Sequence, residues 1–137
     1  MNCLLDTNAC IALINGRPES VRAHLWKALE AGASVWVPCV AAFELWYGVA
    51  KSSRPELNRQ RLETFFAGPL SLLSFEEQDA QVAGKLRATL ESSGKPIGAY
   101  DLLSAAQAMR HELTLITANV GEFSRIHGLV WQDWAKP

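Results

Sequence analysis

Four acidic side chains stand beside or within apolar segments, and their setting makes them the first candidates for chemistry: Asp6, Glu44, Asp101 and Glu122. Glu44 is the most demanding, because an unpaired carboxylate between Phe43 and Leu45 has a large desolvation cost. An ion pair, a bound cation or a helix edge would each explain it. Taken singly, the other three are explained by a turn, a helix dipole or a helix cap. A shared cation accounts for all four together.

The ligand types indicate which cation and which reaction. Carboxylates without nearby histidine or cysteine favour Mg²⁺ or Mn²⁺ over zinc. A cation of this kind activates water and polarises a phosphoryl oxygen, so phosphodiester hydrolysis fits without a protein nucleophile. The three histidines share no spacing with the acids, and the three cysteines have no CxxC pair, so we expect neither group to do chemistry.

Length and composition indicate one compact domain over residues 1–137, with 49% hydrophobic residues to build its core. A formal net charge of −1 does not indicate general nucleic-acid binding, so any affinity for RNA must come from a local patch. The candidates for that patch are Arg17, Lys51, Arg54 and Lys95. The chain has no apolar run long enough for a membrane span and no signal-type N-terminus, so we expect a cytoplasmic protein.

Short apolar strands alternate with helices along the chain. The pattern predicts strands at 2–5, 35–37, 70–75 and 113–117, an edge strand at 129–131, and helices at 9–14, 21–32, 40–50, 55–68, 74–92 and 99–110. We expect Asn8 to cap the first helix, Ser74 and Glu77 to form a capping box, and the 40–50 helix to be buried. The alternation is typical of an α/β fold with a mostly parallel sheet covered on both faces.

The predicted fold places the acids at one edge. Ligands of open parallel sheets bind at the carboxyl ends of the strands. Asp6 follows the first strand, Asn119 and Glu122 follow a later one, and Asp101 stands in the first turn of its helix. We therefore expect these side chains to share one rim of the sheet.

Several motifs together resemble the PIN-domain family, specifically the VapC-type toxins of bacterial toxin–antitoxin pairs. They are Leu4-Leu5-Asp6-Thr7-Asn8, Glu44 followed by Tyr47-Gly48, Pro96-Ile97-Gly98-Ala99-Tyr100-Asp101, Thr117-Ala118-Asn119-Val120-Gly121-Glu122-Phe123, and the tail at Trp134. The resemblance spans the chain. It implies a single-domain α/β/α sandwich and a metal-dependent endoribonuclease that acts on structured RNA such as tRNA. It also implies inhibition by a cognate antitoxin of a type II pair, and a homodimer.

The resemblance assigns metal binding to three acids, because Asp6, Glu44 and Asp101 match the acids that the family uses. At the fourth position many relatives have an aspartate where this chain has Asn119. Either Asn119 contacts a metal-bound water or Glu122 supplies the remaining negative charge. Thr7, Asn8 and Thr117 match polar positions that orient the carboxylates or waters.

Two other functions are compatible with parts of the sequence. Phosphatases with an aspartate nucleophile also place Asp after an apolar strand, but they need a second acid where this chain has Asn8. A PIN-fold module that binds nucleic acid or an antitoxin without catalysis is the other alternative. The aromatic residues leave further choices open: Trp26, Trp46 and the Trp131/Trp134 pair form either a partner surface or core, Tyr47 is expected in the core, and Tyr100 either stacks on a base or packs.

Overall fold

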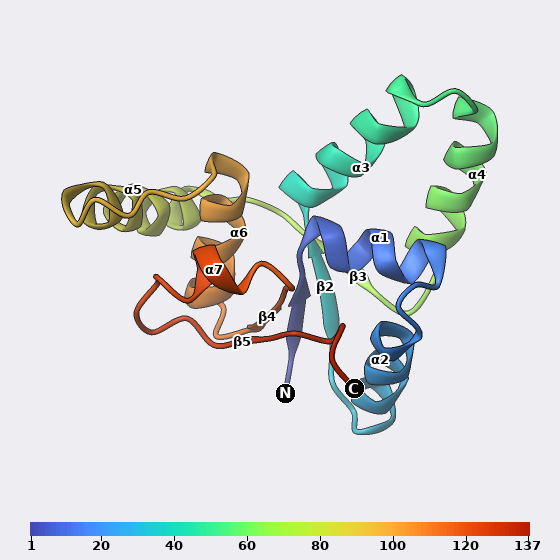
Figure 1. Ribbon diagram of the computed structural model, residues 1–137, viewed down its shortest axis with the longest axis horizontal. Coiled ribbons are helices and arrows are strands. Elements are labelled where there is room, and N and C mark those ends of the chain that lie inside the picture. Colours follow the sequence, from blue (N-terminus) through green and yellow to red (C-terminus); the bar gives the residue numbers. More distant parts are fainter.

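The computed structural model describes residues 1–137 and contains one five-stranded sheet in which every pair of neighbours is parallel (Figure 1). The strand order is β3-β2-β1-β4-β5, which puts β1 at the centre. The strands are β1 (Cys3–Leu5), β2 (Val35–Pro38), β3 (Ser71–Leu73), β4 (Thr114–Ile116) and β5 (Trp131–Gln132). The predicted parallel α/β fold is confirmed, with the edge strand slightly later than expected.

Helices cover both faces of the sheet (Figure 1). Those packed on one face are α1 (Thr7–Asn15), α2 (Glu19–Glu30), α3 (Cys39–Lys51) and α4 (Pro55–Phe66). Those on the other are α5 (Glu77–Ser92), α6 (Ala99–Arg110) and the single turn α7 (Val120–Phe123). The molecule is thus the expected α/β/α sandwich. None of its helices is long and apolar enough to span a bilayer.

The central strand divides the core in two, because successive side chains of a strand point to opposite faces. Cys3 and Leu5 belong to the cluster that includes the buried side chains of α1 to α4. Leu4, between them, belongs to the cluster with Leu102 of α6 and Phe123 of α7. All three side chains of β1 are completely buried. Their packing therefore fixes the position of Asp6, which follows the strand directly at its carboxyl end.

Two predicted helix caps are wrong. The first helix begins at Thr7, and its N-cap is Asp6, whose side chain accepts a hydrogen bond from the N–H of Ala9. Asn8 is therefore an exposed residue of the first turn. The fifth helix is capped by a box of Glu76 and Asp79 instead of Ser74 and Glu77. Its start is delayed because the amide of Gln107 on α6 donates to the carbonyls of Leu73 and Ser74 and holds that segment extended.

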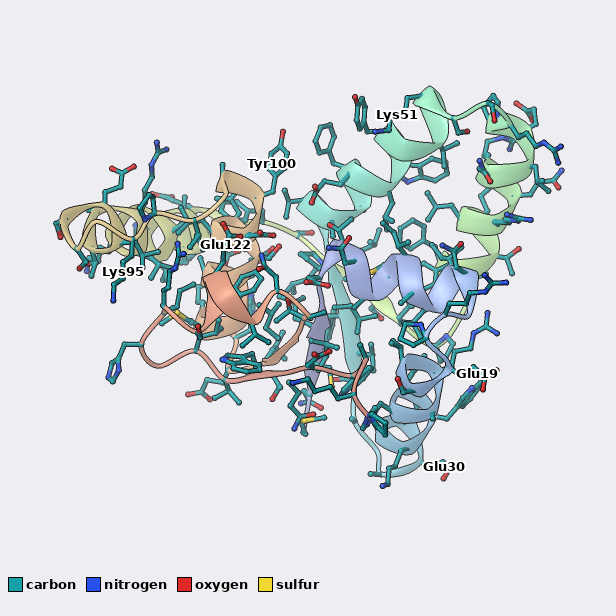
Figure 2. The ribbon with its side chains drawn as sticks, in the orientation of Figure 1. Glu19, Glu30, Lys51, Lys95, Tyr100 and Glu122 are labelled. Carbon is teal, nitrogen blue, oxygen red and sulfur yellow. The ribbon has the colours of Figure 1, made fainter.

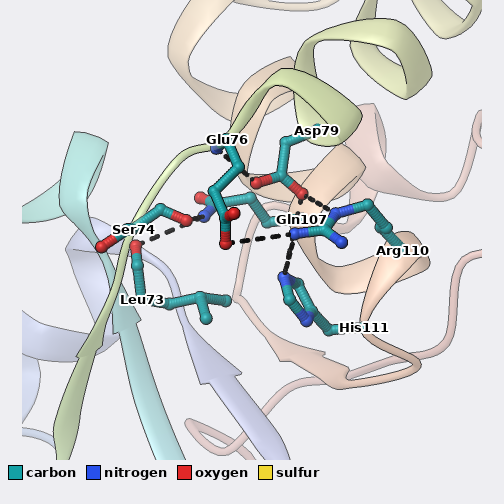
Figure 3. A network of polar contacts seen from close by, with 7 residues as sticks. All are labelled: Leu73, Ser74, Glu76, Asp79, Gln107, Arg110 and His111. Atoms are coloured by element: carbon teal, nitrogen blue, oxygen red, sulfur yellow. Dashed lines mark hydrogen bonds and ion pairs between the residues drawn. The ribbon is translucent and has the colours of Figure 1, made fainter.

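A buried ion pair fastens α5 to α6 (Figure 3). Asp79 is fully buried, and its carboxylate accepts hydrogen bonds from the guanidinium of Arg110 and from the N–H of Glu76. Burial raises the pKa of Asp79, but these bonds and the charges of Arg110 and His111 outweigh it and leave the pKa below its usual value. The ion pair with Arg110 therefore offsets the desolvation cost of the buried Asp79 carboxylate.

The prediction of a buried helix at residues 40–50 is wrong. Only one face of α3 is buried, through Ala41, Ala42 and Leu45. The other face exposes Phe43, Trp46 and Tyr47, and Tyr47 is 57% exposed instead of lying in the core. Apolar composition predicted burial, but only single aromatic rings of α6 and α4 contact this side, Tyr100 against Phe43 and Phe66 against Trp46, and they leave it largely exposed. Of the tryptophans considered for a partner surface, Trp26 and Trp46 are exposed, Trp131 is half-buried, and Trp134 is a core residue at 2% exposure.

Candidate active site

Asp6 lies where the central strand meets the first helix. Its side chain is 5% exposed, with one oxygen 2.8 Å from the N–H of Ala9. Burial raises the pKa of Asp6 above its usual value, while hydrogen bonds from Thr117 and Ala9 lower it. The charges of Glu44 and Asp133 raise it further. A buried carboxylate stays ionised at neutral pH only with such donors or with a counter-ion.

Glu44 projects from α3 toward the start of α1. The carboxylate accepts a hydrogen bond of 2.7 Å from the hydroxyl of Thr7, the residue directly after Asp6. The desolvation problem posed by its apolar neighbours is thus reduced by a hydroxyl donor and by a half-exposed position. This bond links two segments that are 37 residues apart in sequence.

Asp101 and Glu122 form the opposite wall and share one donor, Asn119. The Asn119 amide donates to Glu122 at 2.6 Å and to Asp101 at 3.4 Å. Glu122 also accepts a hydrogen bond from the N–H of Gly98, directly before α6. Asn119 itself is held by Thr117, whose hydroxyl accepts the Asn119 N–H at 2.9 Å. Thr117 thus acts on both walls, because its side chain also lowers the pKa of Asp6.

The pKa of Asp101 is raised by burial and by the charges of the other three acids. Burial is the largest cause that raises the pKa of Asp101 to about 6, and Glu122, Asp6 and Glu44 add to the rise. The pKa of Glu122 is lowered instead, first by the Asn119 hydrogen bond. We conclude that, when Asp101 and Glu122 together bind one proton, Asp101 holds it. The carboxylates of Asp6, Glu44 and Glu122 are near enough to repel the charge of Asp101, as expected for acids that share one cation site.

The side chains are not gathered around an ion in this arrangement. No three histidine, cysteine, aspartate or glutamate side chains form a group compact enough to hold a metal. The carboxylates of Asp6, Glu44 and Glu122 are instead turned to protein donors. The donor set itself is all oxygen and strongly anionic, which is the chemistry that suits Mg²⁺ or Mn²⁺. The residues therefore fit a hard cation, provided that their side chains rotate toward it.

The predicted basic residues are dispersed. Arg17 lines a hollow that also includes Asn8 and Thr117. Lys95 lines a different hollow, beside α5, and the ammonium of Lys51 lies 4.9 Å from the ring centre of Tyr47. Arg54 is exposed directly before α4. Figure 2 shows Lys51 on α3 and Lys95 beside α5, on different sides of the molecule.

Sequence reasoning missed one acid, Asp133. It follows β5, as Asp6 follows β1, and its charge acts on Asp6. The rule that polar residues after parallel strands share a rim would have found it, had the edge strand been placed at Trp131–Gln132. Asn8, by contrast, is exposed and makes no side-chain hydrogen bond. It does not act as the partner acid that a phosphatase of the aspartate-nucleophile type needs.

Comparison with known proteins identifies the family. A model of the PIN domain matches residues 3–129. The chain belongs to the PIN-domain family. Ribonuclease VapC2 of Rickettsia felis is 36% identical over 133 residues, 97% of this chain and 98% of the relative. The tRNA(fMet)-specific endonuclease VapC of Shigella flexneri is 36% identical over 132 residues, 96% and 97% of the two chains.

The fold of this PIN domain has a near neighbour among solved structures. The crystal structure of VapBC2 from Rickettsia felis bound to a promoter DNA fragment superposes with a TM-score of 0.91 and 34% identity, and the match covers 98% of this chain and 99% of that one. The resemblance to VapC-type ribonuclease toxins and the predicted PIN-like sandwich are both confirmed.

Proposed function

We propose that this PIN-domain protein is a metal-dependent endoribonuclease that hydrolyses phosphodiester bonds in structured RNA such as tRNA. One observation carries the proposal: acids from four separate segments come to one edge of the sheet, where Asn119 donates to both Asp101 and Glu122 and the charges of the other acids add to the burial that raises the pKa of Asp101 to about 6. Such a concentration of negative charge is unfavourable in itself and calls for a cation. The relatives named above as a ribonuclease and a tRNA-specific endonuclease support RNA as the substrate.

Asp6, Glu44, Asp101 and Glu122 would hold the Mg²⁺ or Mn²⁺ ion. When bound, the ion supplies Lewis-acid activation of water and of the phosphoryl group. The protein's part is to aim the carboxylates: Thr117 fixes Asp6, Thr7 fixes Glu44, and Asn119 holds Glu122 beside Asp101. The Asp101 carboxyl holds a proton below about pH 6 and would have to release it to act as a ligand. Asn119 acts in this scheme as a positioning residue, and Glu122 as the fourth acid.

The experiment is cleavage of total cellular RNA by the antitoxin-free protein with Mg²⁺ or Mn²⁺, with chelator, and with Asp101→Asn. Glu30→Gln, an exposed change at the far end of α2, is the matched control (Figure 2). We expect discrete fragments from wild type and control, and none with chelator or Asp101→Asn. Cleavage that survives both would refute the site. A folded wild-type protein that cleaves nothing would favour the alternative of a binding module.

We further propose that the protein is the toxin of a type II pair and is inhibited by a cognate antitoxin, as the VapBC2 neighbour suggests. A largely apolar groove of about 280 Å³ lies between α1, α3 and α4, and its lining includes Glu44 and Gly48. Apolar side chains of a partner segment would fill this groove and cover Glu44.

Gly48 offers a test, because a Cβ atom added there meets no atom within 4 Å and a larger side chain would extend from it into the groove. We expect Gly48→Phe to fill the groove and to weaken inhibition by the antitoxin at least about tenfold, while cleavage by the free toxin changes little. Gly84→Phe is the matched control, since Gly84 lies on α5 in equally open space. Unchanged inhibition of Gly48→Phe would place the antitoxin elsewhere.

A further inference from the structure

A second hollow adjoins the carboxylates on another side of α1. It has a volume of about 250 Å³ and lies between α1, the start of α2 and the C-terminal tail. Its walls are mainly apolar and include Ile116 and Trp134, while Asn8, Arg17, Thr117 and Asp133 supply its polar groups. We call it the Asp133 pocket. The pocket adjoins the acidic centre, because Ala9 and Thr117 line it, the Ala9 N–H bonds Asp6, and the charge of Asp133 acts on Asp6.

The charged side chains of the Asp133 pocket form no ion pair, and only Asp133 makes a hydrogen bond within the protein. One oxygen of Asp133 accepts a hydrogen bond of 2.9 Å from the N–H of Ala135, and its other oxygen accepts none. Arg17 makes no side-chain hydrogen bond or ion pair, even though it lines the same pocket as a carboxylate. A half-buried acid without a cationic partner is available for a ligand that donates hydrogen bonds.

The composition of the pocket matches an unpaired nucleobase. Bases of single-stranded RNA pack their faces on apolar and aromatic side chains and are read through hydrogen bonds on their edges. A carboxylate accepts from amino and imino groups, and guanine presents two such donors side by side, whereas uracil has no amino group. The guanidinium of Arg17 suits the phosphate that accompanies the base.

We propose that the Asp133 pocket binds the base beside the cleaved phosphodiester bond and selects guanine through Asp133. This inference rests on the proposed ribonuclease function. Asp133 thereby becomes a specificity-determining residue, outside the four acids assigned to the cation. Arg17 is a phosphate contact that does not discriminate between bases.

The test uses RNA substrates that differ only in the bases flanking the mapped cleavage site. Wild type should cleave the guanine substrate at least about tenfold faster, as kcat/KM, than its uracil counterpart. Asp133→Asn keeps the oxygen that accepts from Ala135 but loses the carboxylate, so this preference should fall to about twofold or less, mainly through a higher KM for guanine. Arg17→Gln should raise KM for all bases alike and flatten the salt dependence. Glu30→Gln should match wild type.

A binding measurement separates this proposal from the proposed function. Guanosine and uridine monophosphates are titrated into wild type and Asp133→Asn, with binding followed by NMR shifts of the indole N–H of Trp134. We expect guanosine monophosphate to bind wild type more tightly than uridine monophosphate, and Asp133→Asn to bind both equally. Equal binding of both nucleotides by wild type, or a base preference that survives in Asp133→Asn, overturns the pocket assignment. Absence of RNA cleavage by wild type overturns the ribonuclease instead, while the nucleotide titration still decides what the pocket binds.

Discussion

At the scale of single residues, the site is a compromise between charge and burial. Asp6 and Asp101 both have pKa values raised first by burial, and each also feels the charge of Glu44. The sequence predicted that carboxylates beside apolar residues, such as Glu44, need a partner that offsets their desolvation cost. The structure supplies Thr7, Thr117 and Asn119 as hydrogen-bond partners of the acids. These hydrogen bonds reduce the repulsion between the acids without removing it.

Asp101→Asn should therefore stabilise the metal-free protein while abolishing cleavage. The folded pKa of Asp101 is about 6 against an ordinary 3.8, so the wild-type carboxylate opposes folding increasingly as the pH rises above about 4, and fully above about pH 6. Because the group is only half-buried, we expect a gain of about 1 kcal/mol in the free energy of unfolding near neutral pH. The gain should fade as the pH falls toward 4. Urea unfolding in the presence of chelator measures it, and a loss of stability near pH 7 would contradict the charge cluster.

Glu122→Gln tests which side chain completes the cation site. If Glu122 is the fourth acid, this change should weaken Mn²⁺ binding about tenfold or more, because one negative charge is lost. Calorimetric titration measures the affinity, with Glu112→Gln, an exposed acid outside the cluster, as the control. An unchanged affinity in Glu122→Gln, together with a large loss in Asn119→Ala, would assign the position to Asn119.

At the scale of elements, periodicity and breaker residues predicted the order of strands and helices and the rim on which the acids lie. The first cap is a local error, since Asp6 follows the strand directly and its side chain accepts from Ala9. The late start of the fifth helix is set by a long-range contact, because Gln107 holds the preceding carbonyls. The exposed side of α3 also escaped prediction, because composition does not reveal which helix face lacks a neighbour.

The ion pair between α5 and α6 should be essential to stability but not to chemistry. Arg110→Met leaves Asp79 buried without its main partner, which should cost about 3 kcal/mol of unfolding free energy. Because the pKa of Asp79 is lowered in the folded state, the pair's contribution is present above about pH 4 and is lost as the pH falls further. Arg87→Met, which breaks only an exposed pair with Glu91, is the control. Urea unfolding at neutral and acidic pH checks both, and equal stability of the two variants would refute this role.

At the scale of the whole molecule, the sheet gathers distant acids at one edge and leaves an aromatic surface beside them. This aromatic face consists of Phe43, Trp46, Tyr47 and Tyr100, all at least 40% exposed. Phe43 on α3 and Tyr100 on α6 touch edge to face with ring centres 5.7 Å apart, so the two helices present one surface. Contiguous exposed aromatic groups indicate an interaction surface.

The predicted homodimer can be tested on this face. We expect sedimentation velocity to show a dimer for the wild type and a shift to monomer for the double variant Phe43→Ser, Tyr47→Ser, since it removes two exposed rings. Val130→Ser, which changes an exposed apolar residue outside the face, should leave the dimer intact. A double variant that remains dimeric would place the subunit interface elsewhere.

The most direct test of the central claim is the rate of RNA cleavage as a function of Mg²⁺ concentration for wild type, Asp6→Asn, Glu44→Gln and Asp101→Asn. The proposed site predicts saturable activation of wild type and, for each variant at saturating Mg²⁺, a rate at least about a hundredfold lower. Wild-type cleavage that persists at full rate after chelation, or variants that cleave as fast as wild type, would contradict a cation-dependent ribonuclease built on these carboxylates.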